Sequence, residues 1–306
     1  MTRTPLTRIV TALIATLLLS SCIFGPDATQ STPTPAPTST ASSGPTRPRL
    51  ELSTYQYALQ TKNKIRVGVR DNAAPYSSRS GSSFTGFEPD IAREIARAIW
   101  GPNEDPNTHI EWVSIDDSTR VSALTSNQAD IVLGALLIND DNKKVIDLSD
   151  AYYRDGQRLL VKKTNDQIKE LVDVTAGDET VTVVKGSRWE ANLRRVTNDR
   201  AKVLPLDTLE FCRQALSSGA ADALSQDEAS LVTLVLNDAT VKIVGKQFTD
   251  EQLGIGIKQN VSADRQGFRE FVNTALLKIV ADRTWAKLYG ASITPITGEQ
   301  KQLPTD

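Results

Sequence analysis

The octet ALTSNQAD at residues 123–130 recurs as ALSSGAAD at residues 215–222. Each copy closes an apolar-periodic stretch, turns at Asn127 or Gly219, and leads into a strand-like run. The offset between the copies is close to the size of a small α/β lobe. The repeat therefore predicts two similar lobes with a ligand bound between them. Because helix–turn–strand junctions reuse the same residue types, a chance match is the alternative.

Strand-like and helix-like segments alternate along the body of the chain. Strands are expected at residues 65–69, 110–115, 130–136, 180–184, 222–225, 241–244 and 253–257, and helices at 119–126, 208–218, 228–236 and 268–279, with one more from about residue 188. Asp90 is expected to cap a further helix, and the Ser-, Asn-, Gly- and Pro-rich residues 71–85 to form a loop. This alternation predicts an α/β fold of mainly parallel sheets, which bind ligands at the carboxyl ends of their strands.

The composition argues against several classes of function. The 306 residues include 35 Lys and Arg against 37 Asp and Glu, so no broad basic face for nucleic acid is expected. The one histidine, His109, lies in a Pro- and Asn-rich connector with no second catalytic group near it in the sequence. With only two cysteines, metal sites built on His or Cys pairs are not expected either. We therefore expect no metal and no cofactor.

The first residues have the pattern of an export signal. Arg3 and Arg8 precede an apolar core at residues 9–19, which is far shorter than the roughly 20 residues that span a bilayer. The core ends in LSSC at residues 19–22, which resembles a bacterial lipobox. That resemblance implies cleavage before Cys22 and lipidation of its thiol, with palmitate among the expected acyl groups. An ordinary signal peptide with an incidental cysteine is the alternative.

A tether and a single free thiol follow from the next stretch. Residues 25–48 are dominated by Ser, Thr, Pro and Ala, a composition that buries too little apolar surface to fold. A lipid, a tether and then a globular body is the layout of a protein held on the outer face of a membrane. Once Cys22 is lipidated, Cys212 has no partner for an intramolecular disulfide, and we expect it to be a small buried helix residue.

Several segments resemble one family. IRVGV at 65–69, GFEPDIA at 86–92 and DIV at 130–132 resemble the amino-terminal lobe of the polar amino-acid-binding proteins of ABC transporters. DLSDAY at 147–152 resembles their "dFSdpY" segment, and VVKGS at 183–187 and SQDE at 225–228 resemble their second lobe. The match covers roughly residues 60–290 in the right order. The chain thus resembles bacterial extracellular solute-binding protein family 3, and most of all its glutamine- and glutamate-binding lipoproteins.

The resemblance implies a type II periplasmic-binding-protein clamshell, in which two α/β lobes are joined by two crossing strands. It divides the chain into a signal peptide (1–21), a lipidated Cys22 with its tether (22–50), lobe 1 (51–156 and 250–294), lobe 2 (157–249) and a tail (295–306).

The family also implies where an amino acid would bind. Asp227 stands where the family keeps the carboxylate that accepts the α-ammonium, although a helix N-cap is the competing role. Asn142 stands where the family keeps an Arg for the α-carboxylate. An Arg–carboxylate bond contributes about 1.5–3 kcal/mol, so its loss would weaken binding of a standard amino acid roughly 10- to 100-fold. Lys143 or Lys144 could substitute if the turn shifts, although such a charge run is usually a solvated face.

Two further departures lie after the first strand. Arg70 falls where relatives often carry an acid and Ala73 where they often carry a stacking aromatic, whereas Tyr76 keeps an aromatic. In lobe 2, the helix N-terminus after Ser187 favours an anion. Arg188 and Trp189 could add a charge and an aromatic face there, or be surface residues of the first turn. The expected ligand-binding residues are Arg70, Tyr76, Ala135, Leu137, Asn142, Ser187, Arg188, Trp189 and Asp227.

The sequence therefore favours a lipid-anchored, monomeric, extracytoplasmic protein that captures a small polar solute, an amino acid or a related anion, for an ABC importer. One alternative is a sensor whose closure is recognised by a membrane partner other than a permease. A second is a dehydratase-like enzyme, for which Asp227 offers an acid but no second group clearly joins it. A body that no longer binds solute is a third.

Overall fold

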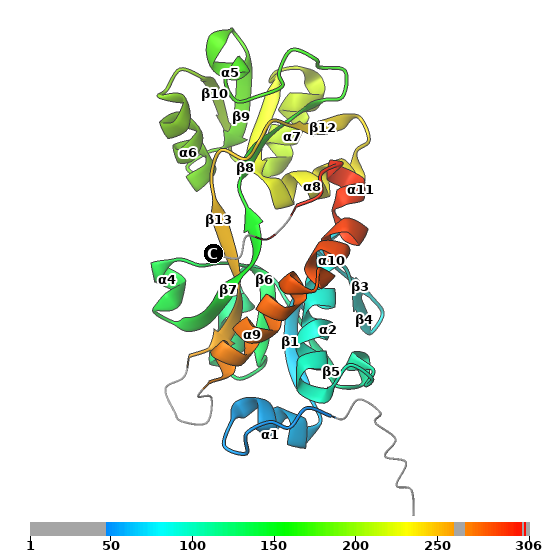
Figure 1. Cartoon of the computed structure of the whole chain (residues 1–306). Helices are drawn as coiled ribbons and strands as arrows, with labels where there is room; N and C mark the ends of the chain where they lie inside the picture. Colours follow the sequence, from blue (N-terminus) through cyan, green and yellow to red (C-terminus); the bar gives the residue numbers. More distant parts are fainter. Residues whose placement is uncertain (1–46, 260–266, 302, 304–306) are drawn as a thin grey trace, which may run out of the picture. The chain divides into compact units, whose positions relative to one another are not determined.

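The computed structural model describes residues 47–259, 267–301 and 303. Residues Gly44–Asp306 form one compact unit that contains two five-stranded sheets and a small third sheet. Helices cover the faces of the two large sheets (Figure 1). The predicted α/β fold with two lobes is confirmed. We call the part built around the first sheet lobe 1 and the part built around the second sheet lobe 2.

The first sheet has the strand order β5-β1-β6-β13-β7. Its strands are β1 (Ile65–Arg70), β5 (Ile110–Ile115), β6 (Ile131–Leu137), β7 (Ile146–Asp155) and β13 (Glu251–Lys258). β1 pairs in parallel with β5 and β6, whereas β13 runs antiparallel to β6 and β7. Strand β13 therefore returns into this sheet after the chain has built lobe 2.

The second sheet has the strand order β10-β9-β11-β8-β12. Its strands are β8 (Gln157–Lys162), β9 (Thr180–Val184), β10 (Lys202–Leu206), β11 (Ala223–Asp227) and β12 (Val241–Val244). β9 pairs in parallel with β10 and β11, and β8 runs antiparallel to β11 and β12.

The prediction of mainly parallel sheets is confirmed in strand direction, although each sheet is mixed. Among the described strands, only β13 in the first sheet and β8 in the second run opposite to the others. Parallel pairing arises where a helical crossover connects two neighbouring strands, as from β1 to β5. Strands β8 and β13, which follow the two crossings between the lobes, enter their sheets in the opposite direction to the other strands. Gly156 lies between β7 and β8, and a Cβ at this position would lie 2.1 Å from the backbone oxygen of Thr249. Only glycine permits that close approach of the two crossing segments.

The helices pack on both large sheets, and their apolar faces form the cores. They are α1 (Tyr55–Lys62), α2 (Phe87–Trp100), η1 (Pro106–Thr108), α3 (Arg120–Thr125), α4 (Asp140–Lys143), α5 (Asp173–Ala176), α6 (Arg188–Thr197), α7 (Leu209–Ser218), α8 (Glu228–Asn237), α9 (Phe268–Ala281), α10 (Thr284–Ser292) and α11 (Thr294–Thr297). Residues 268–279 form the predicted amphipathic helix, with Phe268, Val272 and Leu276 buried. The thiol of Cys212 is buried in α7, as expected.

The two octets occupy equivalent places. The first joins α3 to β6 and the second joins α7 to β11, and both turns use a positive φ, 61° at Asn127 and 83° at Gly219. The closing residue of each octet ties the next strand to a neighbour. Asp130 donates its N–H to Arg66 O and accepts from Arg66 N at 2.8 Å. Asp222 makes the same pair of bonds with Thr180, also accepting at 2.8 Å. The repeat is therefore one junction used once in each lobe.

Two local predictions are wrong. The segment 71–85 is not a loop but holds the small sheet of β2 (Asn72–Ala73), β3 (Ser77–Ser80) and β4 (Ser83–Thr85). Two short antiparallel pairings form this sheet. They were not predicted because the segment is rich in polar residues, and their outward side chains are exposed. Asp90 does not cap α2, because the helix begins at Phe87 and Gly86 holds the cap position with a φ of 119°.

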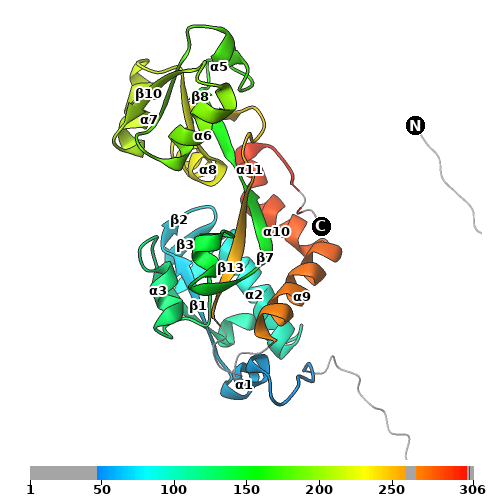
Figure 2. The same cartoon turned by 90° about the vertical axis from the view of Figure 1, so that its left-hand side faces the viewer.

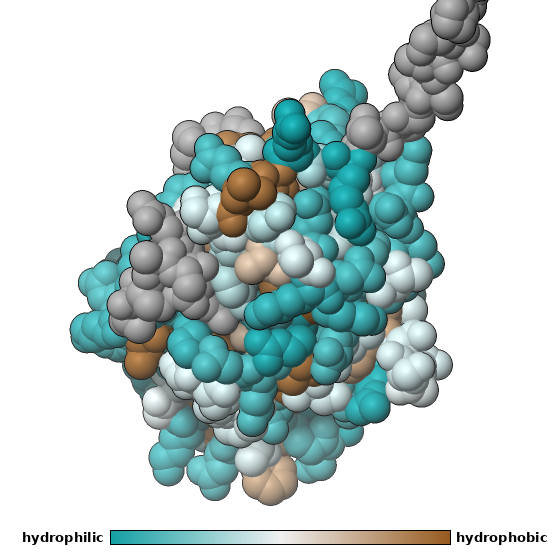
Figure 3. Space-filling view, turned by 90° about the horizontal axis from the view of Figure 1, so that it is seen from below, coloured by the Kyte–Doolittle hydropathy of each residue, from teal (hydrophilic) through white to brown (hydrophobic). Residues whose placement is uncertain are grey.

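Among the described residues no helix is long and apolar enough to cross a membrane, and no cluster of His, Cys, Asp or Glu could hold a metal ion. The predicted signal peptide, Cys22 and most of the tether lie outside the described residues. Figure 2 shows β7 and β13 running together between the two lobes. Figure 3 looks at the end of lobe 1 that carries α1, where polar residues dominate and apolar ones form small separate groups.

Candidate ligand-binding cavity

A cavity of about 400 Å³ is lined by side chains from both lobes. Lobe 1 contributes the ends of β1, β6 and β7, part of the small sheet, and α3, while lobe 2 contributes α6, α7, α8 and the end of β11. Several of these elements can be followed in Figure 2. The lining residues are Arg70, Asn72, Ala73, Tyr76, Asp117, Arg120, Ala135, Leu137, Asp155, Arg188, Trp189, Leu209, Asp227, Ala229, Ser230, Thr233, Leu234 and Leu253.

Most of the expected ligand-binding residues lie in this cavity. Those that line it are Arg70, Tyr76, Ala135, Leu137, Arg188, Trp189 and Asp227. Asn142 and Ser187 are not among the lining residues. The cavity therefore brings together residues that lie far apart in the sequence. It also contains Arg120 and Asp155, which the sequence analysis did not single out.

Arg70 ends β1 and extends toward a buried acid. Its Nη2 lies 3.7 Å from the carboxylate of Glu88, a residue only 1% exposed. The Tyr152 hydroxyl donates to the same carboxylate at 2.6 Å. Burial disfavours the charged guanidinium, but nearby carboxylates, Glu88 first, outweigh it and raise the pKa of Arg70. Arg70 therefore presents a fixed positive charge to the cavity.

Arg120 is a second arginine of lobe 1 in this cavity. Its Nη1 donates to the carbonyl oxygens of Gly134 at 2.9 Å and Ala135 at 3.0 Å. Ala135 has a φ of 54°, a left-handed conformation that costs a non-glycine residue about 1–2 kcal/mol. Arg120 thus stabilises the bent end of β6 while lining the cavity.

Asn142 serves the turn rather than the cavity. Its side-chain amide donates to Leu137 O at 2.8 Å, and its N–H donates to Asn139 Oδ1 at 2.9 Å. These bonds close the short helix α4 against the end of β6. The neighbouring Lys143 and Lys144 are exposed and do not line the cavity either. Asn142 thus has a local structural role.

The N-terminus of α6 is already capped. Ser187 Oγ accepts from the N–H of Glu190 at 3.2 Å, and the Glu190 carboxylate accepts from the N–H of Gly186 at 2.8 Å. This arrangement is close to a capping box, with the Glu190 carboxylate bound to the residue before the N-cap. Because it occupies two N–H groups and adds a negative charge, it opposes the expected use of this terminus for a ligand anion.

Arg188 and Trp189 follow that cap. Arg188 Nη2 lies 2.8 Å from the carboxylate of Glu251 on β13, and its guanidinium lies 4.9 Å from the centre of the Trp189 ring. Trp189 lines the cavity, and its backbone oxygen accepts from Gln157 at 2.8 Å. Arg188 is therefore committed to an ion pair at the cavity wall.

Two buried acids, Asp227 and Asp155, also line the cavity. Asp227 is 7% exposed and caps α8, accepting from Ser230 N at 2.9 Å and from Ser230 Oγ at 3.0 Å. Asp155, the last residue of β7, accepts from Gly156 N at 2.8 Å. Burial is the main cause that raises the pKa of both carboxyls, and for Asp155 the charge of Asp227 raises it further. A positive charge placed beside these two carboxyls would therefore stabilise their ionised forms.

Two residues that line the cavity from opposite lobes carry N–H groups without an acceptor among the described residues. Arg70 Nε and Trp189 Nε1 are both buried and have no hydrogen-bond partner in the part of the chain that the structure describes. A buried donor without an acceptor costs about 1–3 kcal/mol. A ligand group that accepts hydrogen bonds would satisfy such donors.

Sequence reasoning missed Arg120 and Asp155. Arg120 lies three residues before the first octet, where a helix start is the simplest interpretation. Asp155 ends a strand that the sequence did not predict. The pairing of β11 with β8 aligns Asp227 with Gln157 and so brings it near the end of β7, which no local signal could have revealed.

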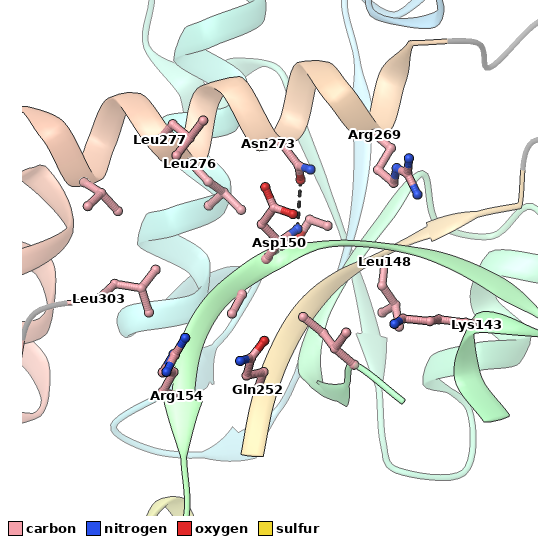
Figure 4. Close-up of a pocket in the computed structure, with 14 residues that line it drawn as sticks. Lys143, Leu148, Asp150, Arg154, Gln252, Arg269, Asn273, Leu276, Leu277 and Leu303 are labelled. Carbon is pink, nitrogen blue, oxygen red and sulfur yellow. Dashed lines mark hydrogen bonds between the residues drawn. The ribbon is translucent and has the colours of Figure 1, made fainter. Parts of the chain in front are cut away.

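A second cavity, of about 410 Å³, lies on lobe 1 between β7 and α9 (Figure 4). Leu276, Leu277 and Leu303 form apolar walls, and Asn273 accepts from the backbone N–H of Asp150 at 2.9 Å. It contains none of the expected ligand-binding residues.

Comparison with known proteins settles the family. The model of the bacterial extracellular solute-binding proteins, family 3, matches residues 65–292. The chain belongs to this family. The resemblance seen in the sequence is thereby confirmed, and the chain is a solute-binding protein by family.

Two curated proteins are similar in sequence to this chain. The ABC transporter glutamine-binding protein GlnH of Bacillus subtilis is 31% identical over 234 residues, covering 76% of this chain and 82% of that protein. The glutamine-binding protein of Geobacillus stearothermophilus is 32% identical over 200 residues, covering 65% and 74%.

Solved structures of similar proteins share the fold. An ancestral cationic amino acid solute-binding protein is 28% identical with a TM-score of 0.62, covering 78% of this chain and 100% of that one. An ancestral amino-acid-binding protein described as a precursor of cyclohexadienyl dehydratase is 26% identical with a TM-score of 0.57, covering 78% and 99%.

Proposed function

We propose that this protein binds a polar α-amino acid of the glutamine type between its lobes and delivers it to an ABC importer. The observation that carries the proposal is the pairing of opposite charges in one cavity. Asp155 and Asp227 line the cavity together with Arg70 and Arg120. This arrangement matches a zwitterion, which brings an ammonium and a carboxylate together. The glutamine-binding relatives point to the same class of ligand.

The α-ammonium would bind at Asp227, with Asp155 as the second acceptor. Both carboxyls are buried and have raised pKa values, so a cation placed between them stabilises their charged forms. Asp227 can keep its capping bonds to Ser230 while a free lone pair accepts from the ligand.

The α-carboxylate would bind at Arg70 and the unpartnered N–H of Trp189. Asn142 is turned to Leu137, so the family's usual arginine contact is replaced rather than repeated. A charge-assisted hydrogen bond contributes about 1.5–3 kcal/mol, which corresponds to roughly 10- to 100-fold in affinity. The replacement would retain amino-acid binding with altered specificity.

Calorimetric titration of the purified protein with glutamine, glutamate, arginine, histidine, a dicarboxylate and a sugar tests this proposal. We expect glutamine to bind and the sugar not to bind. Asp227→Asn and Arg70→Met should each weaken glutamine binding roughly 10- to 100-fold, whereas Lys242→Met, at a partly exposed residue of β12 that does not line the cavity, should not. Unchanged affinity in both cavity variants would reject the site, and binding of the sugar alone would reject the ligand class.

The same proposal includes a lipid anchor on Cys22 and a place on the outer face of the cytoplasmic membrane. It rests on the lipobox-like LSSC and on the tether that follows. Metabolic labelling with a clickable palmitate should tag the wild-type chain and not Cys22→Ser, and the variant should be released from the membrane fraction. Equal membrane retention of both forms would count against the anchor.

A sensing role differs only in the membrane partner. Crosslinking in membranes followed by mass spectrometry should recover a permease if the protein feeds an importer, and a signalling membrane protein if it is a sensor.

An enzyme is a second candidate because the structure brings a second acid, Asp155, to Asp227, and raised carboxyl pKa values suit a general acid. Incubation with each bound ligand, followed by NMR, decides between the two. Solute binding predicts an unchanged ligand spectrum, and an enzyme predicts a product that disappears in Asp227→Asn.

A further inference from the structure

Residues Glu299, Gln300 and Lys301 follow α11 and contact both lobes; we call them the C-terminal strap. Gln300 Nε2 donates to Ala286 O of α10 at 2.9 Å, and Gln300 Oε1 accepts from Thr294 at 3.1 Å. Glu299 and Lys301 instead reach residues of lobe 2. The strap thus contacts lobe 1 through Gln300 and lobe 2 through Glu299 and Lys301.

On lobe 2 the strap meets a buried ion pair. Arg158 on β8 and Glu228 at the start of α8 lie 2.8 Å apart and are 4% and 0% exposed. Glu299 lies 2.9 Å from the Arg158 guanidinium, and the ammonium of Lys301 lies 2.5 Å from the Glu228 carboxylate. Helix α11, which leads into the strap, packs against α8, as Figures 1 and 2 show.

The charges of this cluster divide evenly between the strap and lobe 2. Arg158 and Glu228 form one neutral pair, and Glu299 and Lys301 form another. When the strap leaves, lobe 2 therefore keeps a paired arginine and glutamate, and no buried charge loses all its partners. Breaking a buried pair by removing one partner costs far more than separating two neutral pairs. Glu299 is already 51% exposed, so its return to water is easy. The arrangement of charges therefore allows the C-terminal strap to separate from lobe 2.

The cluster also borders the ligand cavity. Glu228 directly follows Asp227, and it accepts from the Tyr153 hydroxyl at 3.3 Å. The Tyr153 hydroxyl lies 2.9 Å from that of Tyr76, which lines the cavity. Lys301 Nζ lies 5.9 Å from the centre of the Tyr153 ring. A continuous set of polar contacts thus joins the strap to the cavity.

We infer that the C-terminal strap is a detachable third link between the lobes, beside the two crossing strands, that sets their opening equilibrium and thereby the affinity for ligand. The effect on affinity rests on the proposed function, whereas the effect on opening does not. Glu299, Gln300 and Lys301 act as positioning residues, because none of them lines the cavity.

Distances between spin labels in the ligand-free full chain test the link. Labels on Glu111→Cys of β5 and Lys202→Cys of β10, both exposed, report on lobe 1 and lobe 2 in a Cys22→Ser, Cys212→Ala background. We expect a broader distance distribution in the double variant Glu299→Gln/Lys301→Met. The matched control, Asp166→Asn/Lys242→Met, removes an ion pair of 3.0 Å within lobe 2 and should leave the distribution unchanged.

Two further variants separate the strap from folding. Gln300→Ala cuts the lobe 1 side and keeps all four charges, so it carries the test if the double variant does not fold. Lys301→Arg keeps the charge and should restore the wild-type distribution. Titration with glutamine should show about 3- to 10-fold weaker binding in the double variant, because the binding-competent fraction falls.

Distributions as narrow as wild type in both Gln300→Ala and the double variant would overturn the strap, whatever the affinity. If glutamine binds to none of the proteins, the proposed ligand is wrong, and the distances in the ligand-free chain still decide whether the strap links the lobes.

Discussion

At the scale of single residues, Asp155 makes a clear prediction about pH. Its raised folded-state pKa means that the folded protein holds this proton more tightly than the unfolded chain, whose Asp titrates near about 3.9. Its contribution to stability is therefore complete below about pH 3.9 and is lost as the pH rises through the raised pKa. Asp155→Asn should remove that loss and increase the free energy of unfolding at pH 7 by about 1–3 kcal/mol.

Urea unfolding of the ligand-free protein between pH 4 and pH 8 measures this change. Asp150→Asn, an exposed carboxylate on the same strand, serves as the control and should follow the wild-type curve. The pKa assignment is wrong if wild type and Asp155→Asn lose stability in parallel as the pH rises.

At the scale of elements, the repeated junction predicts unequal costs for one substitution made twice. Asp130 is 2% exposed and accepts from Arg66 and from the Tyr55 hydroxyl, at 2.7 Å from each side chain. Asp222 is exposed and its bond to Thr180 N replaces a bond to water. We expect Asp130→Ala to cost about 3 kcal/mol of unfolding free energy and Asp222→Ala about 1 kcal/mol.

Urea unfolding of the two variants under identical conditions checks the difference. Each variant is the control for the other, since both remove the residue that closes an octet. Equal costs would mean that burial and the Arg66 pair add nothing to the shared backbone bonds.

The repeat also shows which parts of the fold can be predicted from the sequence. Helix–turn–strand junctions are local, so Asn127 and Gly219 could be placed from neighbouring residues alone. The antiparallel entry of β8 and β13 depends on where the chain crosses between lobes, which no local pattern records. Segment 71–85 was missed for a related reason, because its short strands carry polar side chains and little apolar alternation.

The residues of the cavity also divide into those that local sequence predicts and those that depend on contacts between distant segments. Arg70 and Asp227 could be anticipated because each ends a strand whose carboxyl end faces the cleft. Asp155 and Arg120 could not, since their approach depends on pairing between distant strands and on the bend at Ala135. Asn142 was expected at the ligand, and its bond to Leu137 was not foreseeable from the turn sequence.

At the scale of the whole molecule, the charge of the cavity sets which amino acid it prefers. The lining holds three arginines and three aspartates, and one arginine, Arg188, is paired with Glu251 on β13. Burial, followed by the charge of Asp227, raises the pKa of Glu251, while Arg188 opposes the shift. Glu251 therefore competes with any ligand carboxylate for Arg188.

Glu251→Gln should free Arg188 and remove that competition, so the affinity for glutamate should rise about tenfold relative to glutamine, the equivalent of one charge-assisted hydrogen bond. The ratio of the two dissociation constants, measured by calorimetry, is the readout because it cancels any general change in lobe closure. Glu210→Gln, which removes an exposed carboxylate paired with Arg213 on α7, should leave the ratio unchanged. A ratio that stays constant in Glu251→Gln would mean that Arg188 only joins the lobes and does not contact the ligand's side chain.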